Sequence, residues 1–306
     1  MVEDVQAEFK AAGLRAAVRR HDTAAIFDWL IEAVSYQGIA DRVAHDYIRR
    51  HGTITWADIE ANLAAGITCP KLTTYWQFQG CRYHKTGRTC AEPDHIDGCC
   101  LPRHPLRNGR LNQTAYSLFL FIRDVCDGDL VGWIDRQLEA ASASDGPDRV
   151  GQMREALLTP LRQIYGVSDK VLTMALSCLL VGGSKGRPLW GEIGVSLIAV
   201  DTLVHNFLHR TGILRRLDAD HAYGPACYQS GGCADIIAGV AERIDARAFN
   251  LSFPQVFPRY VQAAIWRYCA QLGFDICNGN NIDDRQRCQN SQCTLYSICD
   301  RISLKS

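Results

Sequence analysis

Hydrophobic residues recur along much of the chain at the spacing of one face of a helix. The clearest examples are Phe27, Leu30, Ile31 and Val34 in one segment and Leu118, Ile122 and Val125 in another. Alternation with a period of two, which is typical of half-buried strands, is scarce. The pattern therefore predicts an all-α protein.

The predicted helices cover most of the chain. They lie at 1–21, 24–50 (one long helix or two short ones), 111–126, 130–141, 150–164, 170–181, from about 201, and 256–273. A polar linker at 142–147, a flexible loop at 182–188 and a loop at 218–233 separate them. Residues 69–110 form an irregular insert rich in cysteine, histidine, proline and glycine, and the last thirty residues are rich in cysteine.

Composition narrows the class of protein. With 306 residues and 47% hydrophobic residues, the chain can bury the core of one large or two small domains. The net charge of zero means that a nucleic-acid partner must be argued from local features. The acidic start at 1–4 is unlike a signal peptide, and apolar runs such as 173–182 are too short to span a bilayer. We expect a cytoplasmic protein (bacterial-type cytosol or nucleoid) without membrane association.

Reduced thiols in that compartment favour metal binding for many of the 14 cysteines. Four of them close the chain with the spacing C-x10-C-x4-C-x5-C: Cys277, Cys288, Cys293 and Cys299. Four thiolates on a compact loop are the minimum set for an iron–sulfur cluster or an all-cysteine zinc site, and spacing alone does not choose between them. Cys269, on the preceding helix, is a possible substitute ligand.

The insert predicts a second metal site. Its preferred ligands are Cys69, Cys81, Cys90 and Cys99; Cys100 could replace Cys99, and His84, His95 and His104 lie nearby. The insert has too few apolar residues in register to fold by itself, and zinc or another iron–sulfur cluster would supply the missing stability. A loop with free thiols, packed against the helices, is the alternative. Cys227 and Cys233 are left open, whereas Cys126 and Cys178 fall in helical patterns and are assigned to the core.

The same insert is locally basic. Residues 81–110 hold six Lys or Arg against three Asp or Glu, and Tyr75, Trp76, Phe78 and Tyr83 lie close by in sequence. This combination suits contact with a DNA backbone and stacking on bases. A solvated basic loop explains the charges equally well.

Two further segments carry candidate chemistry. Residues 164–173, IYGVSDKVLT, suggest a helix, a tight turn at Gly166 and a second helix with Lys170 in its first turn. Exposed amides at such a turn suit a phosphate oxygen, and the positive end of a helix favours the neutral, nucleophilic form of an amine. Residues 198–212, IAVDTLVHNFLHRTG, place Asp201 at a helix start, where it could also be only a cap.

These two segments resemble the helix-hairpin-helix, Gly/Pro-Asp superfamily of DNA glycosylases, especially its endonuclease III and adenine-glycosylase branches. The family hairpin has the pattern L-P-G-V-G-x-K-T-A, and the stretch around its catalytic aspartate has V-D-T-x-V-x-R. The resemblance puts Lys170 at the Schiff-base lysine and Asp201 at the catalytic aspartate. It puts the C-terminal cysteines where the family holds a [4Fe–4S] cluster, which favours iron. Tyr165 and Ser168 stand where the family has Pro and Gly.

A third match covers 28–37, DWLIEAVSYQ, which is similar to the first barrel helix of the family. It puts Gln37 at the residue that wedges into the duplex beside a flipped base, and Glu32 at the glutamate that protonates a purine. Gly166 and Ser168 would hold the DNA backbone at the hairpin.

The resemblance implies a two-lobed fold. A helical barrel at 24–195, with the insert at 69–110, would form one lobe, and 1–23 with 196–306 would form the cluster lobe. A DNA-binding cleft would lie between them, with Lys170 and Asp201 on opposite walls.

The implied function is base-excision repair. A monomer would bind double-stranded DNA with a damaged or mismatched base, flip the base out, and cleave at the abasic site through attack of Lys170 on C1′. One alternative is a monofunctional purine glycosylase that uses Glu32 and a water activated by Asp201. The other is a non-catalytic, DNA-binding iron–sulfur protein.

Overall fold

The computed structural model describes residues 2–35, 41–66, 69–84, 89–96, 99, 110–143, 146 and 148–304. It divides into two compact units, Val2–Gly194 and Val195–Ser306. Helices dominate both, which confirms the all-α prediction. The paired strands of the described part are two residues each, β1 (Tyr83–His84) and β2 (Thr89–Cys90), and are antiparallel. None of the described helices is long and apolar enough to cross a membrane.

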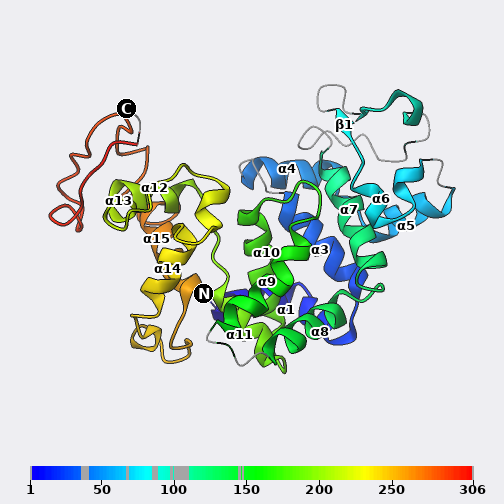
Figure 1. Cartoon of the computed structure of the whole chain (residues 1–306), viewed down its shortest axis with the longest axis horizontal. Helices are drawn as coiled ribbons and strands as arrows, with labels where there is room; N and C mark the ends of the chain where they lie inside the picture. The colour runs from blue at the N-terminus through cyan, green and yellow to red at the C-terminus, as the bar shows by residue number, and fades with distance from the viewer. Residues whose placement is uncertain are drawn as a thin grey trace. The chain divides into compact units, whose positions relative to one another are not determined.

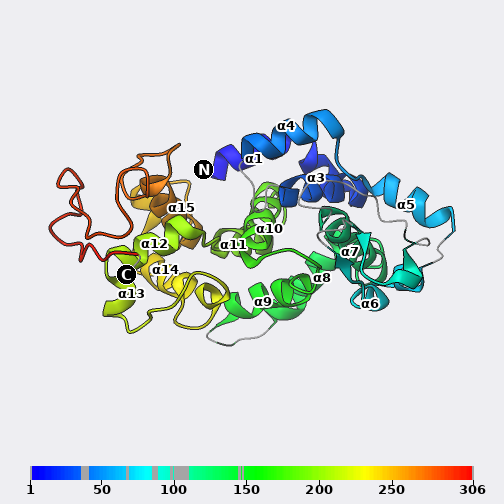
Figure 2. The same ribbon diagram turned by 90° about the horizontal axis from the view of Figure 1, so that it is seen from above.

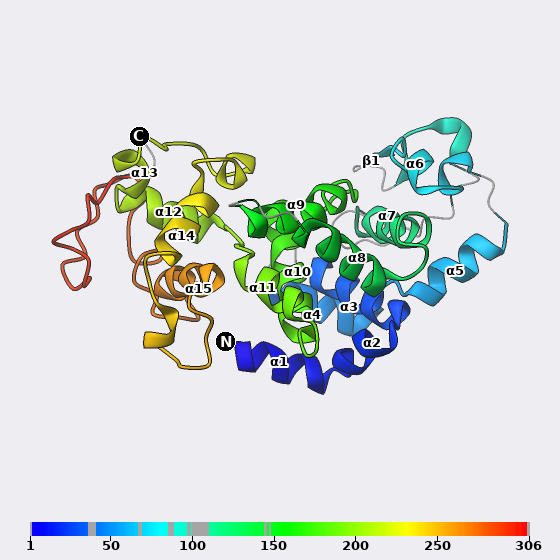
Figure 3. The ribbon, with the colours of Figure 1, turned by 60° about the horizontal axis from the view of Figure 1, so that its bottom comes forward.

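The first unit contains the predicted hairpin and the insert. Its elements are α1 (Val2–Ala11), α2 (Leu14–Arg20), α3 (Thr23–Ser35), α4 (Asp41–His51), α5 (Trp56–Ala64), η1 (Pro70–Leu72), α6 (Tyr75–Phe78), β1, β2, η2 (Pro93–His95), α7 (Arg110–Asp124), α8 (Leu130–Ser142), α9 (Arg149–Leu161), α10 (Asp169–Gly183) and the start of α11 (Pro188–Ser196). The insert elements β1 and α6 lie next to α7 in Figures 1 and 3.

Helix α10 is the centre of this unit (Figure 1). It is apolar around most of its circumference, as expected for a helix surrounded by others, and packs against α1, α2, α3 and α9. Gly182 and Gly183 permit the closest approaches: a Cβ on Gly182 would lie 2.4 Å from the Phe9 ring, and one on Gly183 would lie 2.8 Å from Trp190. Residues 2–23 therefore pack with the hairpin unit, which differs from their expected assignment to the cluster lobe, and 182–183 are helical instead of part of a loop.

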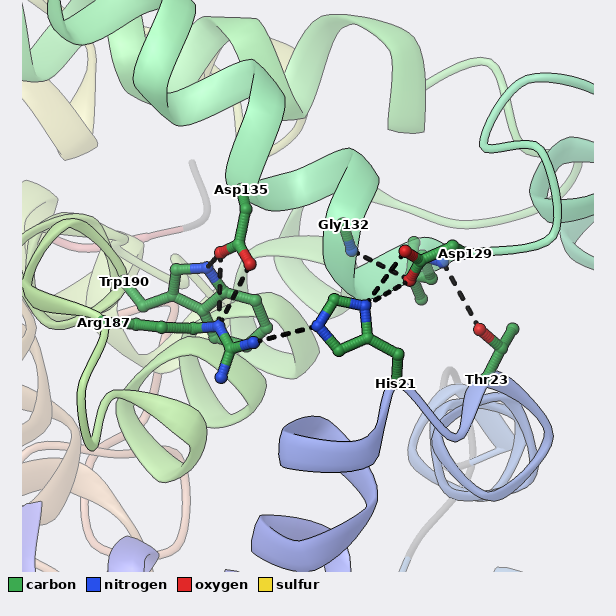
Figure 4. A network of polar contacts seen from close by, with 8 residues as sticks. His21, Thr23, Asp129, Gly132, Asp135, Arg187 and Trp190 are labelled. Atoms are coloured by element: carbon green, nitrogen blue, oxygen red, sulfur yellow. Dashed lines mark hydrogen bonds and ion pairs between the residues drawn. The ribbon is translucent and has the colours of Figure 1, made fainter.

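A polar network fixes the turn after α10, for which the sequence had predicted flexibility (Figure 4). His21 Nδ1 lies 2.9 Å from the Asp129 carboxylate, and the Arg187 guanidinium lies 3.2 Å from His21 Nε2. Asp135 accepts hydrogen bonds from Arg187 Nε at 3.1 Å and from the Trp190 indole N–H at 2.6 Å. These bonds join α2, α8 and the start of α11.

The second unit contains α12 (Thr202–Arg210), α13 (Ile213–Arg216), η4 (Pro225–Tyr228), α14 (Cys233–Ala241), η5 (Ala246–Ala248) and α15 (Pro258–Cys269). Helices α12 and α14 both pack on α15 around a core that includes Val204, Leu208 and Ile237. Residues 270–304 contain no helix or strand and appear as irregular coil in Figures 1 and 2. Side-chain contacts or a bound group must hold such a segment, since backbone ladders do not.

Candidate metal centres and catalytic residues

Helix α12 connects the candidate groups of the second unit. Asp201 caps its N-terminus, with a carboxylate oxygen that accepts a hydrogen bond from the Val204 amide at 2.9 Å. This bond uses Oδ1, and the side chain is half-buried. Asp201 thus has the cap role that the sequence allowed, with its carboxylate at the positive end of the helix.

The four C-terminal cysteines line one cavity. Cys277, Cys288, Cys293 and Cys299 surround it together with Phe207 and Arg210 from α12. Cys269, the possible substitute ligand, does not line the cavity. It contacts Cys277, and the hydrogen bond between the two thiols lowers the pKa of Cys277. The positive charge of Arg210 acts in the same direction.

The walls of this C-terminal cavity supply hydrogen bonds and positive charge. The Tyr268 hydroxyl lies 3.0 Å from Cys293 Sγ, and the Arg301 amide donates to Cys299 Sγ at 3.3 Å. The Nε atoms of Arg210 and Arg301 are buried, and neither has a hydrogen-bond partner among the described residues. N–H and O–H groups directed at thiolates, beside guanidinium groups, suit a negatively charged metal–thiolate group.

The predicted insert ligands also line one cavity. Cys69, Cys81, Cys90 and Cys99 surround it, and His95 is a fifth potential ligand. The Glu92 amide donates to Cys90 Sγ at 3.4 Å, and Gln113 Nε2 donates to Cys81 Sγ at 3.5 Å. Burial raises the pKa of Cys81 to about 12, and the thiols of Cys99, Cys90 and Cys69 add to the effect, as expected when four thiols crowd together. Cys100 and His104 lie outside the described residues.

The second unit holds a tight group of potential metal ligands that the sequence pattern did not predict. One nitrogen or sulfur atom from each of His205, His221, Cys227 and Cys233 lies within 4.8 Å of the others, so the group could hold a metal ion. Helix α12, the loop after α13, η4 and α14 contribute one ligand each. In the sequence, three of the four ligands form a recognisable pattern, the spacing H-x5-C-x5-C over residues 221–233.

The hairpin of the first unit joins α9 to α10. Gly166 has φ +76° at the turn, and a Cβ there would lie 2.9 Å from Thr114 Oγ1 on α7. Lys170 is half-buried in the first turn of α10, and its neighbour Asp169 pairs with Arg162 at 2.8 Å. Ser168 is at the N-cap position of α10 and is exposed. The predicted helix–turn–helix is therefore present in the structure.

The buried helix α7 connects this hairpin to the insert. Gln113 donates to the Cys81 carbonyl at 3.2 Å, while Ser117 Oγ accepts from the Tyr165 amide at 2.9 Å. Both polar side chains are fully buried. Helix α7 thus has the same position in the first unit as α12 has in the second, between a cysteine-lined cavity and a candidate catalytic segment.

No protein-family model, curated protein or solved structure matches this chain.

The remaining predicted residues are less well supported. Glu32 is exposed on α3, and Gln37 lies outside the described residues. Of the aromatic residues assigned to base stacking, Tyr75 and Phe78 are buried in the core, whereas Trp76 is 64% exposed. Most of the basic residues of the insert lie outside the described part of the chain; Arg82 is exposed. Of these three aromatic side chains, Trp76 alone is exposed enough to stack on a base.

Proposed function

We propose that this protein is an iron–sulfur DNA glycosylase with abasic-site lyase activity. The observation that carries the proposal is the course of α12. This helix of nine residues is capped by Asp201 and ends at Arg210, which lines the cavity of the four C-terminal cysteines. It therefore links the candidate catalytic aspartate to the candidate cluster site, and this supports the proposal.

The geometry favours a cluster over a single zinc ion in the C-terminal cavity. One tetrahedral ion at about 2.3 Å from each sulfur would bring the sulfurs to about 3.8 Å from one another. Among the described residues, only the group around His205 brings its ligand atoms within 4.8 Å. The four cavity cysteines do not form such a group, and their wider spacing suits a [4Fe–4S] cluster bound by four thiolates.

The same argument extends to the insert. Its cavity has four thiols that are likewise not within 4.8 Å of one another, and the same local hydrogen bond, from the amide two residues after a cysteine to its sulfur. We propose a second iron–sulfur cluster at Cys69, Cys81, Cys90 and Cys99. When bound, each cluster would cross-link a segment that has little regular secondary structure and so stabilise its fold.

The reaction would rest on residues of the chain itself. Backbone amides at 166–168 would hold a phosphate of the DNA. The Lys170 amine would attack C1′ while the glycosidic C1′–N bond breaks, and the base would leave after gaining a proton. The Asp201 carboxylate would stabilise the positive charge that develops on the sugar. The C1′–O4′ bond would then break as a proton passes from the Lys170 nitrogen to O4′, which opens the sugar ring and leaves a Schiff base at Lys170. Loss of a C2′ proton would break the C3′–O bond by β-elimination, with the 3′ phosphate as the leaving group.

Borohydride trapping tests this proposal. Iron-loaded protein is incubated with duplexes that carry an abasic site or a panel of damaged and mismatched bases. We expect a covalent adduct with the wild type, none with Lys170→Ala, and an undiminished adduct with Lys185→Ala, which removes an exposed lysine near the end of the same helix. Base release without trapping would favour the hypothesis of a monofunctional purine glycosylase that uses Glu32 and Asp201. DNA binding with neither reaction would favour the hypothesis of a non-catalytic, DNA-binding iron–sulfur protein.

A further inference from the structure

The group formed by His205, His221, Cys227 and Cys233 is separate from both cysteine cavities, because none of its members lines either of them. Three of the four side chains are buried, and His221 is half-buried. The four side chains come from four segments, and their nitrogen and sulfur atoms lie next to one another.

The distances within this group match a single tetrahedral ion. His205 Nδ1 lies 3.4 Å from Cys233 Sγ and 3.5 Å from Cys227 Sγ, and His221 Nε2 lies 3.4 Å from Cys233 Sγ. Zinc–nitrogen bonds of about 2.0–2.1 Å and zinc–sulfur bonds of about 2.3 Å, at the tetrahedral angle, place N and S about 3.6 Å apart. The observed separations are within about 0.2 Å of that value.

The outer contact of His221 also fits metal binding. Its Nδ1 lies 2.6 Å from the Ala219 carbonyl oxygen, so Nδ1 carries the proton and donates it there. The other ring nitrogen, Nε2, lies 3.4 Å from the sulfur of Cys233 and is the atom that would bind a metal. A backbone carbonyl that fixes the tautomer of a histidine in this way is the usual outer-shell partner of a metal ligand.

We propose that His205, His221, Cys227 and Cys233 bind one structural zinc ion. Two imidazoles and two thiolates complete a tetrahedral shell, and the two thiolate charges neutralise the divalent ion. Because protein side chains fill all four positions, no site remains for water or substrate, and the ion has a structural role. It would join α12 to α14 and to the loop between them. The inference is independent of the proposed glycosylase activity.

Metal analysis of the full chain tests the assignment. Protein is purified from cells grown with both iron and zinc, and the two metals are quantified by mass spectrometry. We expect about one zinc per chain in the wild type. We expect at least about a tenfold loss of zinc in Cys227→Ser/Cys233→Ser, with the iron content retained. The matched control, His209→Ala, removes the histidine one turn further along α12 and should keep its zinc.

Cobalt substitution covers the case in which the double variant fails to fold. Wild-type protein loaded with Co²⁺ should show tetrahedral ligand-field bands and a thiolate-to-cobalt charge-transfer band. Cys227→His should keep the tetrahedral bands and lose about half of the charge-transfer intensity, because one thiolate of two remains. A wild type without zinc and without these cobalt bands would overturn the proposal. So would zinc that persists unchanged in the double variant, or iron in its place at this site.

Discussion

The two cysteine-lined cavities differ in how their surroundings balance charge. In the insert, Lys71 pairs with Glu92, and His95 lies 3.4 Å from the same carboxylate. In the C-terminal cavity, Arg210 pairs with Asp284 at 2.7 Å, but Arg301 stacks on the Tyr296 ring at 4.4 Å and pairs with no carboxylate among the described residues. Both arginines also bury an Nε without a partner in that part of the chain.

This difference indicates unequal dependence on the bound group. A negatively charged cluster would compensate the half-buried Arg301 guanidinium, and its loss would leave that charge without a carboxylate partner among the described residues, whereas Arg210 would keep Asp284. The insert would lose a cross-link, but its lysine would keep Glu92 as a partner. We therefore expect the second unit to depend more strongly on its metal than the insert does.

The largest predicted effect follows from removing a C-terminal ligand. Cys288→Ala should release the cluster from this cavity and destabilise residues 270–304 by several kcal/mol, because metal binding and folding are coupled in such segments. Iron analysis should show about half of the wild-type iron, and hydrogen exchange should show loss of protection confined to the second unit. Cys178→Ala, a cysteine outside both cavities, is the control and should keep all of its iron.

Removal of an insert ligand should have a smaller effect. Cys81→Ala should also lose about half of the iron, but we expect increased exchange to be confined to 69–99. The C-terminal segment should remain protected and thermal unfolding of the rest should change little. Equal destabilisation by Cys81→Ala and Cys288→Ala would contradict the difference drawn between the two cavities.

Glycine substitutions examine the contact between α7 and the hairpin. Gly166 and Gly186 have nearly the same φ, +76° and +79°, but a Cβ would meet Thr114 only at Gly166. Alanine at either position should cost about 1–2 kcal/mol for the left-handed backbone. Gly166→Ala should cost more than Gly186→Ala in urea unfolding, and it should weaken binding to duplex DNA. Equal costs would show that α7 does not support the turn.

The smallest effect concerns pH and the network of Figure 4. Burial opposes ionisation of Asp129, but hydrogen bonds from the Gly132 amide and His21 outweigh it, so the pKa of Asp129 lies below its ordinary value of 3.8. Its stabilising contribution is complete above that ordinary value and is lost as the pH falls through the lower folded value.

Asp129→Asn should remove this acid dependence while keeping the cap of α8. Asp129→Ala should cost about 1 kcal/mol more at neutral pH. Thermal unfolding between pH 3 and pH 7 measures both, and identical acid profiles for wild type and Asp129→Asn would contradict the assignment.

Local pattern was sufficient for most of the helices. The predicted segments at 111–126 and 130–141 correspond to α7 (Arg110–Asp124) and α8 (Leu130–Ser142), because a hydrophobic period of 3.6 residues is a property of neighbouring residues. The cap at Asp201 and the hairpin turn at Gly166 could be predicted for the same reason. The grouping of cysteines in the insert and in the last thirty residues was sufficient to predict which thiols line each cavity, since short segments can only reach a small volume.

Contacts between distant segments were decided by tertiary structure. The Phe9 ring packs on Gly182 because the absence of a Cβ leaves room for it. Nothing in the local sequence around either residue specifies the other. His205 and His221 meet Cys227 and Cys233 only after α12, η4 and α14 have folded together. The sequence by itself therefore determined the helices, the hairpin and the two cysteine sets. The docking of the N-terminal helix and the four-ligand group required the folded chain, because their partners are brought together by packing and not by sequence spacing.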